Sequence, residues 1–248
     1  MFGIILTFLS GLAIILGSMI VLLLKNNKKL TDFSISMAAG VMSALLILEL
    51  IPESIELLSD TYTITRSIII VIISSLIGIM ILKTLDLFIP DHDHEENIDN
   101  DNLFHIGIVS SIALILHNLI EGMAIYSSSL TDGNIGILLT LGICLHNIPL
   151  GIMITSTLYK SNNNRKKTIL IIALISLSTL LGGILMFLLS KIINDIIRGV
   201  LLAITIGMII YIVLFELIPE IQTIKSKKTS IIGLILGVLI FMLTLFFE

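Results

Sequence analysis

Two short polar motifs interrupt long apolar stretches in the middle of the sequence, and both carry residues that are suited to binding a metal ion. The motif at 117–122 reads His-Asn-Leu-Ile-Glu-Gly, and the motif at 146–151 reads His-Asn-Ile-Pro-Leu-Gly. Ionisable groups cost free energy at membrane depth, so a helix that keeps them there normally lines a binding site or an ion path. Two such motifs, close together in the sequence, predict one shared site.

The spacing within the motifs predicts which side chains meet. Positions four apart on a helix lie about 40° from each other and one turn apart, so His117 and Glu121 share one face. His146 can supply a third ligand from a neighbouring helix, and the amides of Asn118 and Asn147 offer neutral oxygen atoms. Imidazole and carboxylate together suit Zn²⁺ or Fe²⁺ better than Ca²⁺ or Mg²⁺, which prefer oxygen ligands alone.

The composition assigns the chain to the membrane. Hydrophobic residues make up 56% of its 248 residues, against about 45–50% in soluble domains, and the mean hydropathy is +1.12. About 20 apolar residues span a bilayer as a helix. We therefore predict an all-α integral membrane protein, a single domain over 1–248 that contacts lipid along eight transmembrane helices, near residues 3–24, 33–56, 66–88, 104–126, 135–158, 168–190, 197–219 and 229–247.

The basic residues predict how these helices are oriented. Cytoplasmic loops retain Lys and Arg, and most of the 14 basic residues fall in the connections that follow the first, third, fifth and seventh predicted helices. The other side holds three basic residues, Arg66, Lys191 and Arg198. We therefore expect both termini to be extracytoplasmic, in a multi-pass protein of the plasma (cell inner) membrane.

Two further motifs indicate an internal repeat. Residues 48–53 read Leu-Glu-Leu-Ile-Pro-Glu and residues 215–220 read Phe-Glu-Leu-Ile-Pro-Glu, each at the same distance from a preceding glycine, Gly40 or Gly207. The two helices that carry them are predicted to cross the membrane in opposite directions. Matching segments in opposite orientation are typical of inverted-repeat transporters, whose site lies between the two halves.

The glutamates of this repeat are predicted to line a cation path. Glu49 and Glu216 lie deeper in their helices, and we expect them to act as stepping points for the ion. For Glu53 and Glu220 a second interpretation stays open, in which both are simply solvated at helix ends.

The predicted cytoplasmic loop at 89–103 is the most polar part of the chain. His92 and His94 alternate with carboxylates there, a pattern that can bind metal loosely. An acidic segment without apolar residues is equally typical of a flexible connector. Both interpretations stay open.

On these features the chain resembles the ZIP (Zrt-, Irt-like protein) family of divalent metal transporters, in its bacterial branch. The family pattern His-Asn-x-x-(Asp/Glu)-Gly matches residues 117–122, and the pattern His-(Asn/Asp/Glu)-x-Pro-Glu-Gly matches 146–151 except at Leu150. The resemblance implies a 3+2+3 inverted-repeat arrangement of the eight helices, with the metal held between the fourth and fifth.

The departures from the family pattern predict how many ions bind. Leu150 stands where bacterial relatives usually have a Glu that bridges two metals, and the sixth predicted helix has no carboxylate at 178–183. A second ion would lose two charged ligands. We therefore expect a mononuclear site of His117, Glu121 and His146, with Asn118, Asn147 and Met42 as weak or transient partners.

The leading functional hypothesis is import of a divalent transition metal, with zinc first and iron or manganese as alternatives, and without a permanent cofactor or enzymatic activity. A transport-impaired metal-binding protein, receptor-like or structural, is the alternative. An intramembrane metalloprotease is less favoured because Asn118 and Asn147 stand where His-Glu-x-x-His needs its general base.

The sequence contains no basic patch with interleaved aromatic residues, so we do not expect the chain to bind nucleic acid. The spacing of Gly233 and Gly237 indicates helix packing, within the chain or in a homodimer.

Overall fold

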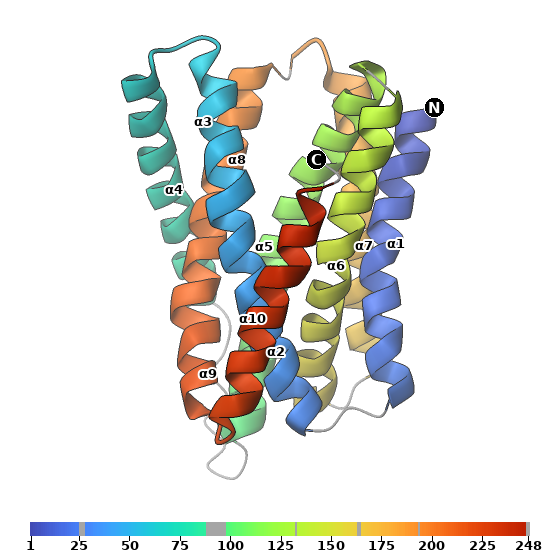
Figure 1. Cartoon of the computed structure of the whole chain (residues 1–248), viewed down its shortest axis with the longest axis vertical. Helices are drawn as coiled ribbons and strands as arrows, with labels where there is room; N and C mark the ends of the chain where they lie inside the picture. The colour runs from blue at the N-terminus through green and yellow to red at the C-terminus, as the bar shows by residue number, and fades with distance from the viewer. Residues whose placement is uncertain (25–27, 88–97, 132, 163–164, 193, 247–248) are drawn as a thin grey trace.

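The computed structural model describes residues 1–24, 28–87, 98–131, 133–162, 165–192 and 194–246, and the described residues form helices without any strand. Figure 1 shows them as a bundle of long, roughly parallel and antiparallel helices. Eight helices within the described residues are long and apolar enough to cross a membrane. The predicted all-α membrane class with eight spans is therefore confirmed, whereas the 3+2+3 arrangement stays a prediction. His92 and His94 lie outside the described residues.

Six of the spans are single helices, and two are interrupted by a π-helical turn. The single helices are α1 (Phe2–Leu24), α4 (Ile64–Asp86), α5 (Ile98–Thr131), α6 (Gly133–Asn162), α7 (Arg165–Leu189) and α10 (Lys227–Thr244). The interrupted spans are α2 (Lys28–Leu45), η1 (Leu46–Leu50) and α3 (Ile51–Ser59), followed later by α8 (Asp195–Tyr211), η2 (Ile212–Leu217) and α9 (Ile218–Thr223).

The start of α5 differs from the expected loop boundary. We predicted that the polar connection would continue to residue 103, but the helix already begins at Ile98. Residues 99–102 read Asp-Asn-Asp-Asn. Acidic residues are favourable at a helix N-terminus because they face the positive end of its dipole. The low hydropathy of this stretch therefore marks the end of the apolar span but not the end of the helix.

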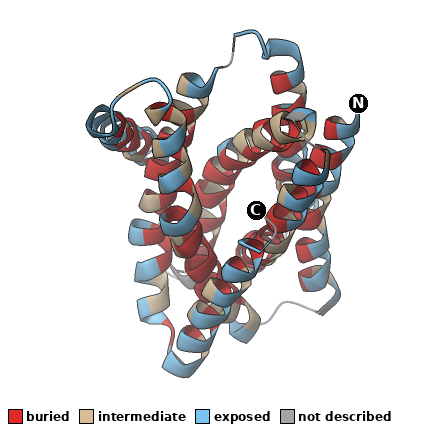
Figure 2. Ribbon diagram, turned by 45° about the horizontal axis from the view of Figure 1, so that its top comes forward, coloured by how far each residue is buried: buried red, intermediate tan, exposed pale blue. Residues whose placement is uncertain are grey.

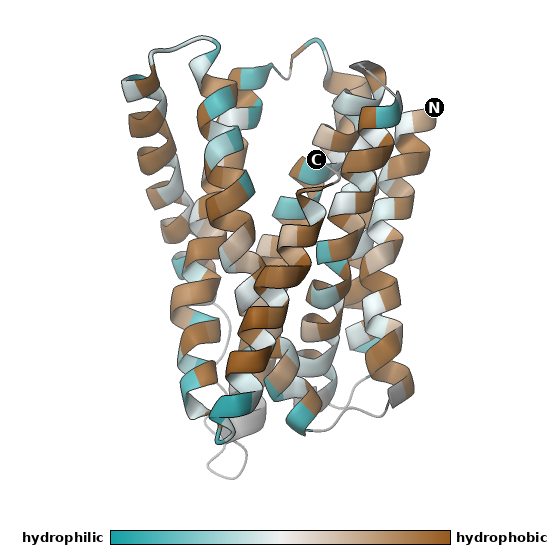
Figure 3. Cartoon of the chain, viewed as in Figure 1, coloured by the Kyte–Doolittle hydropathy of each residue, from teal (hydrophilic) through white to brown (hydrophobic). Residues whose placement is uncertain are grey.

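Apolar side chains cover the outside of the bundle as well as its core. On α4, for example, Ile69, Ile72 and Ile73 are each at least half exposed. Figure 3 shows hydrophobic residues along the middle of the helices and hydrophilic residues gathered toward their ends, and Figure 2 shows that buried residues face the interior. An apolar exterior of this extent is what a lipid environment requires.

Both π-helical turns end two residues before a proline of the repeated motif. Pro52 and Pro219 occupy the first turns of α3 and α9. Proline has no N–H to donate and its ring crowds the preceding turn, and a π-helical turn is one way to absorb that disturbance. In each case an N–H donates to the carbonyl five residues back, from Ile51 to Leu46 and from Ile218 to Val213.

Glycines join the helices in four closely packed pairs. A Cβ on Gly122 of α5 would collide with the Thr179 carbonyl of α7, and a Cβ on Gly182 of α7 would collide with the Leu119 carbonyl of α5. Small residues allow such close backbone approach in membranes. Three other pairs show the same reciprocal contact: Gly17 with Gly151 between α1 and α6, Gly40 with Gly237 between α2 and α10, and Gly78 with Gly207 between α4 and α8.

The pattern of glycine pairs supports the predicted inverted repeat. Exchanging the first three spans for the last three, and α5 for α6, turns the α1–α6 pair into α7–α5 and the α2–α10 pair into α8–α4. The exchange therefore places each of the four glycine pairs on another of the four. Figure 1 also shows that the α2–η1–α3 span and the α8–η2–α9 span run in opposite directions. Two groups of helices result, one of α1, α5, α6 and α7, and one of α2, α3, α4, α8, α9 and α10.

Candidate metal centre

Three buried side chains from α5 and α6 converge at one point. Oε1 of Glu121 lies 2.8 Å from Nε2 of His117, one turn earlier on α5, and 2.7 Å from Nε2 of His146 on α6. The two imidazole ring centres are 6.2 Å apart. Both histidines are fully buried and Glu121 is 6% exposed. A carboxylate at this depth is costly unless it is paired, and here two imidazoles pair with it.

The donor set fits a transition-metal ion. Among the described residues, these three form the one group of three or more His, Cys, Asp or Glu side chains whose ligand atoms lie within 4.8 Å of one another. Two ligands of one tetrahedral zinc ion lie about 3.3 Å apart, so the Glu121 contacts must lengthen slightly when an ion enters. The other Glu121 oxygen, Oε2, is buried without a hydrogen-bond partner in the part of the chain that the structure describes, and it is available as a ligand.

A cavity of about 370 Å³ leads from this cluster toward one end of the bundle. His117 and Glu121 lie at its inner end, while Glu56, near the end of α3, and Ser128, near the end of α5, lie toward its mouth. Its remaining walls come from α3, α5, α6, α8 and η1. An ion that enters at this end can therefore reach two of the three candidate ligands.

The side chains expected to act as weak partners are all buried. Asn118 donates from Nδ2 to the Ile175 carbonyl on α7 at 3.3 Å, and its Oδ1 atom has no hydrogen-bond partner among the described residues. Neither amide atom of Asn147 has one. Met42 belongs to the main apolar core and does not line the cavity. The role of these three residues as ligands stays a prediction.

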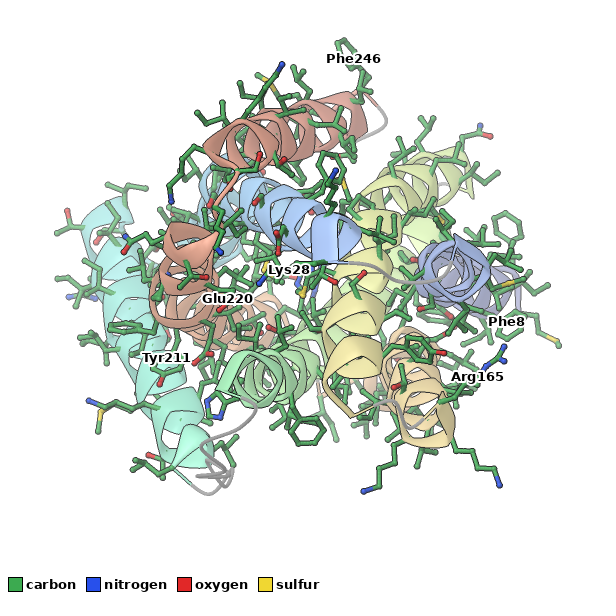
Figure 4. All side chains as sticks on the ribbon, turned by 90° about the horizontal axis from the view of Figure 1, so that it is seen from below. Phe8, Lys28, Arg165, Tyr211, Glu220 and Phe246 are labelled. Carbon is green, nitrogen blue, oxygen red and sulfur yellow. The ribbon has the colours of Figure 1, made fainter. Side chains whose placement is uncertain are left out.

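The four repeat glutamates divide between the two ends of the bundle. Glu49 and Glu53 line the cavity. Glu216 lies on the other side of the cluster, 9% exposed, with its Oε1 atom 3.7 Å from Nε2 of His105 on α5. Glu220 is half-buried near the lower end of the bundle, which Figure 4 views end-on. The sequence contains no pattern that joins His105 to Glu216, because only the packing of α5 against η2 brings them together.

The sequence identifies Arg198 only as a basic residue and does not predict its place in the cavity. Arg198 lines the cavity beside the glutamates and forms an ion pair with Asp195, Nη1 to Oδ1, at 3.0 Å. In the sequence it is an isolated basic residue at the start of a predicted span. The signal that could have identified it is its position on the side of the membrane where basic residues are otherwise scarce.

Together, the fold and the site define a class of protein: a multi-pass membrane protein that can receive a metal ion between its helices. Comparison with known proteins identifies the family. The family described as ZIP Zinc transporter matches residues 89–245. The chain is 30% identical to the zinc transporter ZupT of Streptococcus mutans, over 97% of this chain and 95% of that protein. It is 31% identical to the ZupT of Clostridium perfringens, over 97% of this chain and 93% of that protein.

The chain therefore belongs to the ZIP zinc transporter family. Members of this family are transporters and not enzymes, which confirms the expectation that the chain is not an enzyme. The assignment supports divalent metal ions as the transported substrate.

Proposed function

We propose that this protein imports a divalent transition metal, zinc foremost and iron or manganese less favoured, through one mononuclear site of His117, Glu121 and His146. The observation that carries the proposal is the convergence of two imidazole nitrogens on one carboxylate oxygen, within 2.8 Å, at the inner end of a cavity. This nitrogen and oxygen donor set favours a borderline dication over Ca²⁺ or Mg²⁺.

A single ion is favoured by what surrounds the cluster. Leu150 follows His146 by four residues on α6, just as Glu121 follows His117 by four residues on α5. Leu150 is 1% exposed and, unlike Glu121, carries no charge. On the adjacent α7, Thr179 is buried and its hydroxyl has no hydrogen-bond partner among the described residues. Neither the alkyl side chain of Leu150 nor the neutral hydroxyl of Thr179 can replace a carboxylate around a second dication.

The distribution of basic residues supports a cavity that faces the outside, as import would require. The cavity opens at the end of the bundle that carries the α3–α4 connection. The helices α2, α7 and α10 start at the opposite end, and each starts with Lys or Arg residues. Figure 4 views that opposite end and labels Lys28 and Arg165 there. Because cytoplasmic ends retain basic residues, we assign the cavity to the outside, both termini to the extracytoplasmic side and the protein to the plasma membrane.

We infer that the route toward the cytoplasm is closed in this conformation. Beyond the cluster, Leu114 and Met153 are buried in the main apolar core. The pair of His105 and Glu216 links α5 to η2 on that side. We infer that the group of α1, α5, α6 and α7 shifts against the other helices to open this route, because the site belongs to the first group and the repeat glutamates to the second.

Zinc uptake into proteoliposomes tests the proposal. We expect wild-type protein to accumulate zinc, while His117→Ala and Glu121→Gln lose most uptake and remain in the membrane. Asp60→Asn is the matched control, because Asp60 is an exposed carboxylate that does not line the cavity. Wild-type rates in the two site variants would overturn the assignment of the site. Metal binding without uptake by the wild type would favour the transport-impaired alternative, which Leu150 suggests.

A further inference from the structure

Arg198 is a basic residue placed among acidic residues at the mouth of the cavity. Its side chain is 17% exposed and lines the same cavity as three glutamates, Glu49, Glu53 and Glu56. Its ion-pair partner is Asp195, which is 55% exposed. A positive charge in this position is unexpected in a passage for cations, because it opposes the attraction that the carboxylates provide.

Arg198 is not needed to stabilise α8, so helix stability does not explain why a basic residue stands at this position. Arg198 is the fourth residue of the helix. The helix N-terminus is the positive end of the helix dipole, so a cation there is unfavourable. The helix start already has its own cap, since Oδ1 of Asn194 accepts a hydrogen bond from the N–H of Ile197 at 3.0 Å. The ion pair with Asp195 is largely exposed on the acidic side, and such pairs contribute little to stability. The charge of Arg198 therefore calls for an explanation other than folding.

The inverted repeat indicates that this arginine belongs to one side of the path only. The repeat relates Glu49 to Glu216 and Glu53 to Glu220, with the same offset of residue number in both pairs. The same offset relates Arg198 to Thr31, which is uncharged and fully buried. The glutamates thus occur in both halves, whereas Arg198 has no basic counterpart.

We propose that Arg198 controls cation entry by limiting how strongly the cavity mouth concentrates dications. This inference rests on the proposed function. The guanidinium offsets part of the negative potential of the three glutamates, and its effect on an ion is proportional to the ion's charge. Carboxylate oxygens alone are the ligands that Ca²⁺ and Mg²⁺ prefer. Arg198 therefore reduces retention of these hard ions at the mouth, and selection is left to the imidazole-containing site below.

The experiment compares two arginines on the same side of the membrane. Arg66, near the start of α4, is exposed and does not line the cavity, so Arg66→Gln removes the same charge without altering the mouth. Initial rates of zinc uptake into proteoliposomes are measured against zinc concentration for wild type, Arg198→Gln, Arg198→Lys and Arg66→Gln. Each series is run at low and at high ionic strength, with and without added Ca²⁺.

We expect Arg198→Gln to lower KM for zinc about threefold at low ionic strength, with kcat unchanged, and the effect to shrink at high salt. Inhibition by Ca²⁺ should become stronger in the same variant. Arg198→Lys and Arg66→Gln should both resemble wild type. If Arg198→Gln does not reach the membrane, Asp195→Asn provides a second test, because loss of this carboxylate should raise KM.

Three results would overturn the role of Arg198: equal KM values for Arg198→Gln and wild type, equal shifts in Arg198→Gln and Arg66→Gln, or an Arg198→Lys variant that behaves like Arg198→Gln. Failure of the proposed function has a different signature, because wild-type protein would then take up no zinc at all.

Discussion

At the level of single residues, Glu121 joins the candidate ligands, because one of its oxygens contacts both histidines. Its other oxygen has no hydrogen-bond partner among the residues that the structure describes. The histidine partners of Glu121 come from two different helices, so Glu121 also couples α5 to α6. Without a metal, this arrangement keeps a carboxylate tolerable at membrane depth. With a metal, the same oxygens are ready to coordinate.

Removal of the Glu121 charge should therefore abolish tight binding. We expect Glu121→Gln to weaken zinc affinity by more than the ~10–100-fold that loss of an outer partner of a metal ligand costs. Isothermal titration of the detergent-solubilised protein measures this directly. Asp60→Asn again serves as the control, and unaltered affinity in Glu121→Gln would show that the ion binds elsewhere.

Leu150 provides a second prediction at this scale. It stands at the same distance from His146 as Glu121 stands from His117. We expect Leu150→Glu to raise the amount of bound zinc from one ion per chain toward two, because a carboxylate would then be available from each helix. Elemental analysis of purified protein gives the ratio, and Leu150→Met is the control of similar size. A ratio of one in Leu150→Glu would mean that the missing carboxylate on α7 decides the number.

At the level of helices, glycine contacts fix the elements that carry the site. Gly122 directly follows Glu121, and together with Gly182 it brings α5 and α7 into backbone contact. Gly17 and Gly151 do the same for α1 and α6, which carries His146. The candidate ligands therefore lie on helices that are tightly joined to neighbours in their own group. Contacts of this kind favour movement of the group as one body.

Substitution of Gly182 should show this constraint as a loss of stability. A Cβ there would collide with the Leu119 carbonyl, so we expect Gly182→Ala to destabilise the protein by about 1–3 kcal/mol. Thermal unfolding in detergent gives the shift. Gly133→Ala is the matched control, because its nearest neighbour atom would lie at an ordinary 3.5 Å. Equal melting temperatures for the two variants would contradict tight packing at Gly182.

Some features of the helices could be predicted from the sequence, and others could not. Eight spans followed from apolar length alone, and the spacing of His117 and Glu121 predicted a shared face because helix geometry is local. The contacts of Arg198 and His105 were not predictable, since they depend on which helices pack side by side. The π-helical turns were also missed, because a proline motif predicts a disturbance but not its form.

At the level of the whole molecule, the inverted repeat that we predict from the sequence implies a second conformation, which is not seen here. Ser128 lines the open cavity and lies eleven residues after His117; Thr157 lies eleven residues after His146 and is fully buried. Exchange of the two halves would move Thr157 to the wall of a cavity that opens to the cytoplasm. The pair of His105 and Glu216 would have to separate in that conformation.

Cysteine labelling tests this exchange. In a Cys144→Ser background, which lacks the chain's single cysteine, we expect Ser128→Cys to react with a membrane-impermeant thiol reagent from outside. Thr157→Cys should react only from the cytoplasmic side, in inside-out vesicles. Ile69→Cys, on the exposed apolar face of α4, is the control. Labelling of both path positions from the same side would contradict an exchange of access between the two ends.

The most direct measurement of the metal centre is zinc K-edge X-ray absorption on the purified protein loaded with zinc. We expect one zinc per chain with two imidazole nitrogens and carboxylate oxygen at about 2.0–2.2 Å, and loss of the imidazole signal in a His117→Ala, His146→Ala double variant. A shell of oxygen atoms alone, or an unchanged spectrum in the double variant, would contradict binding between α5 and α6.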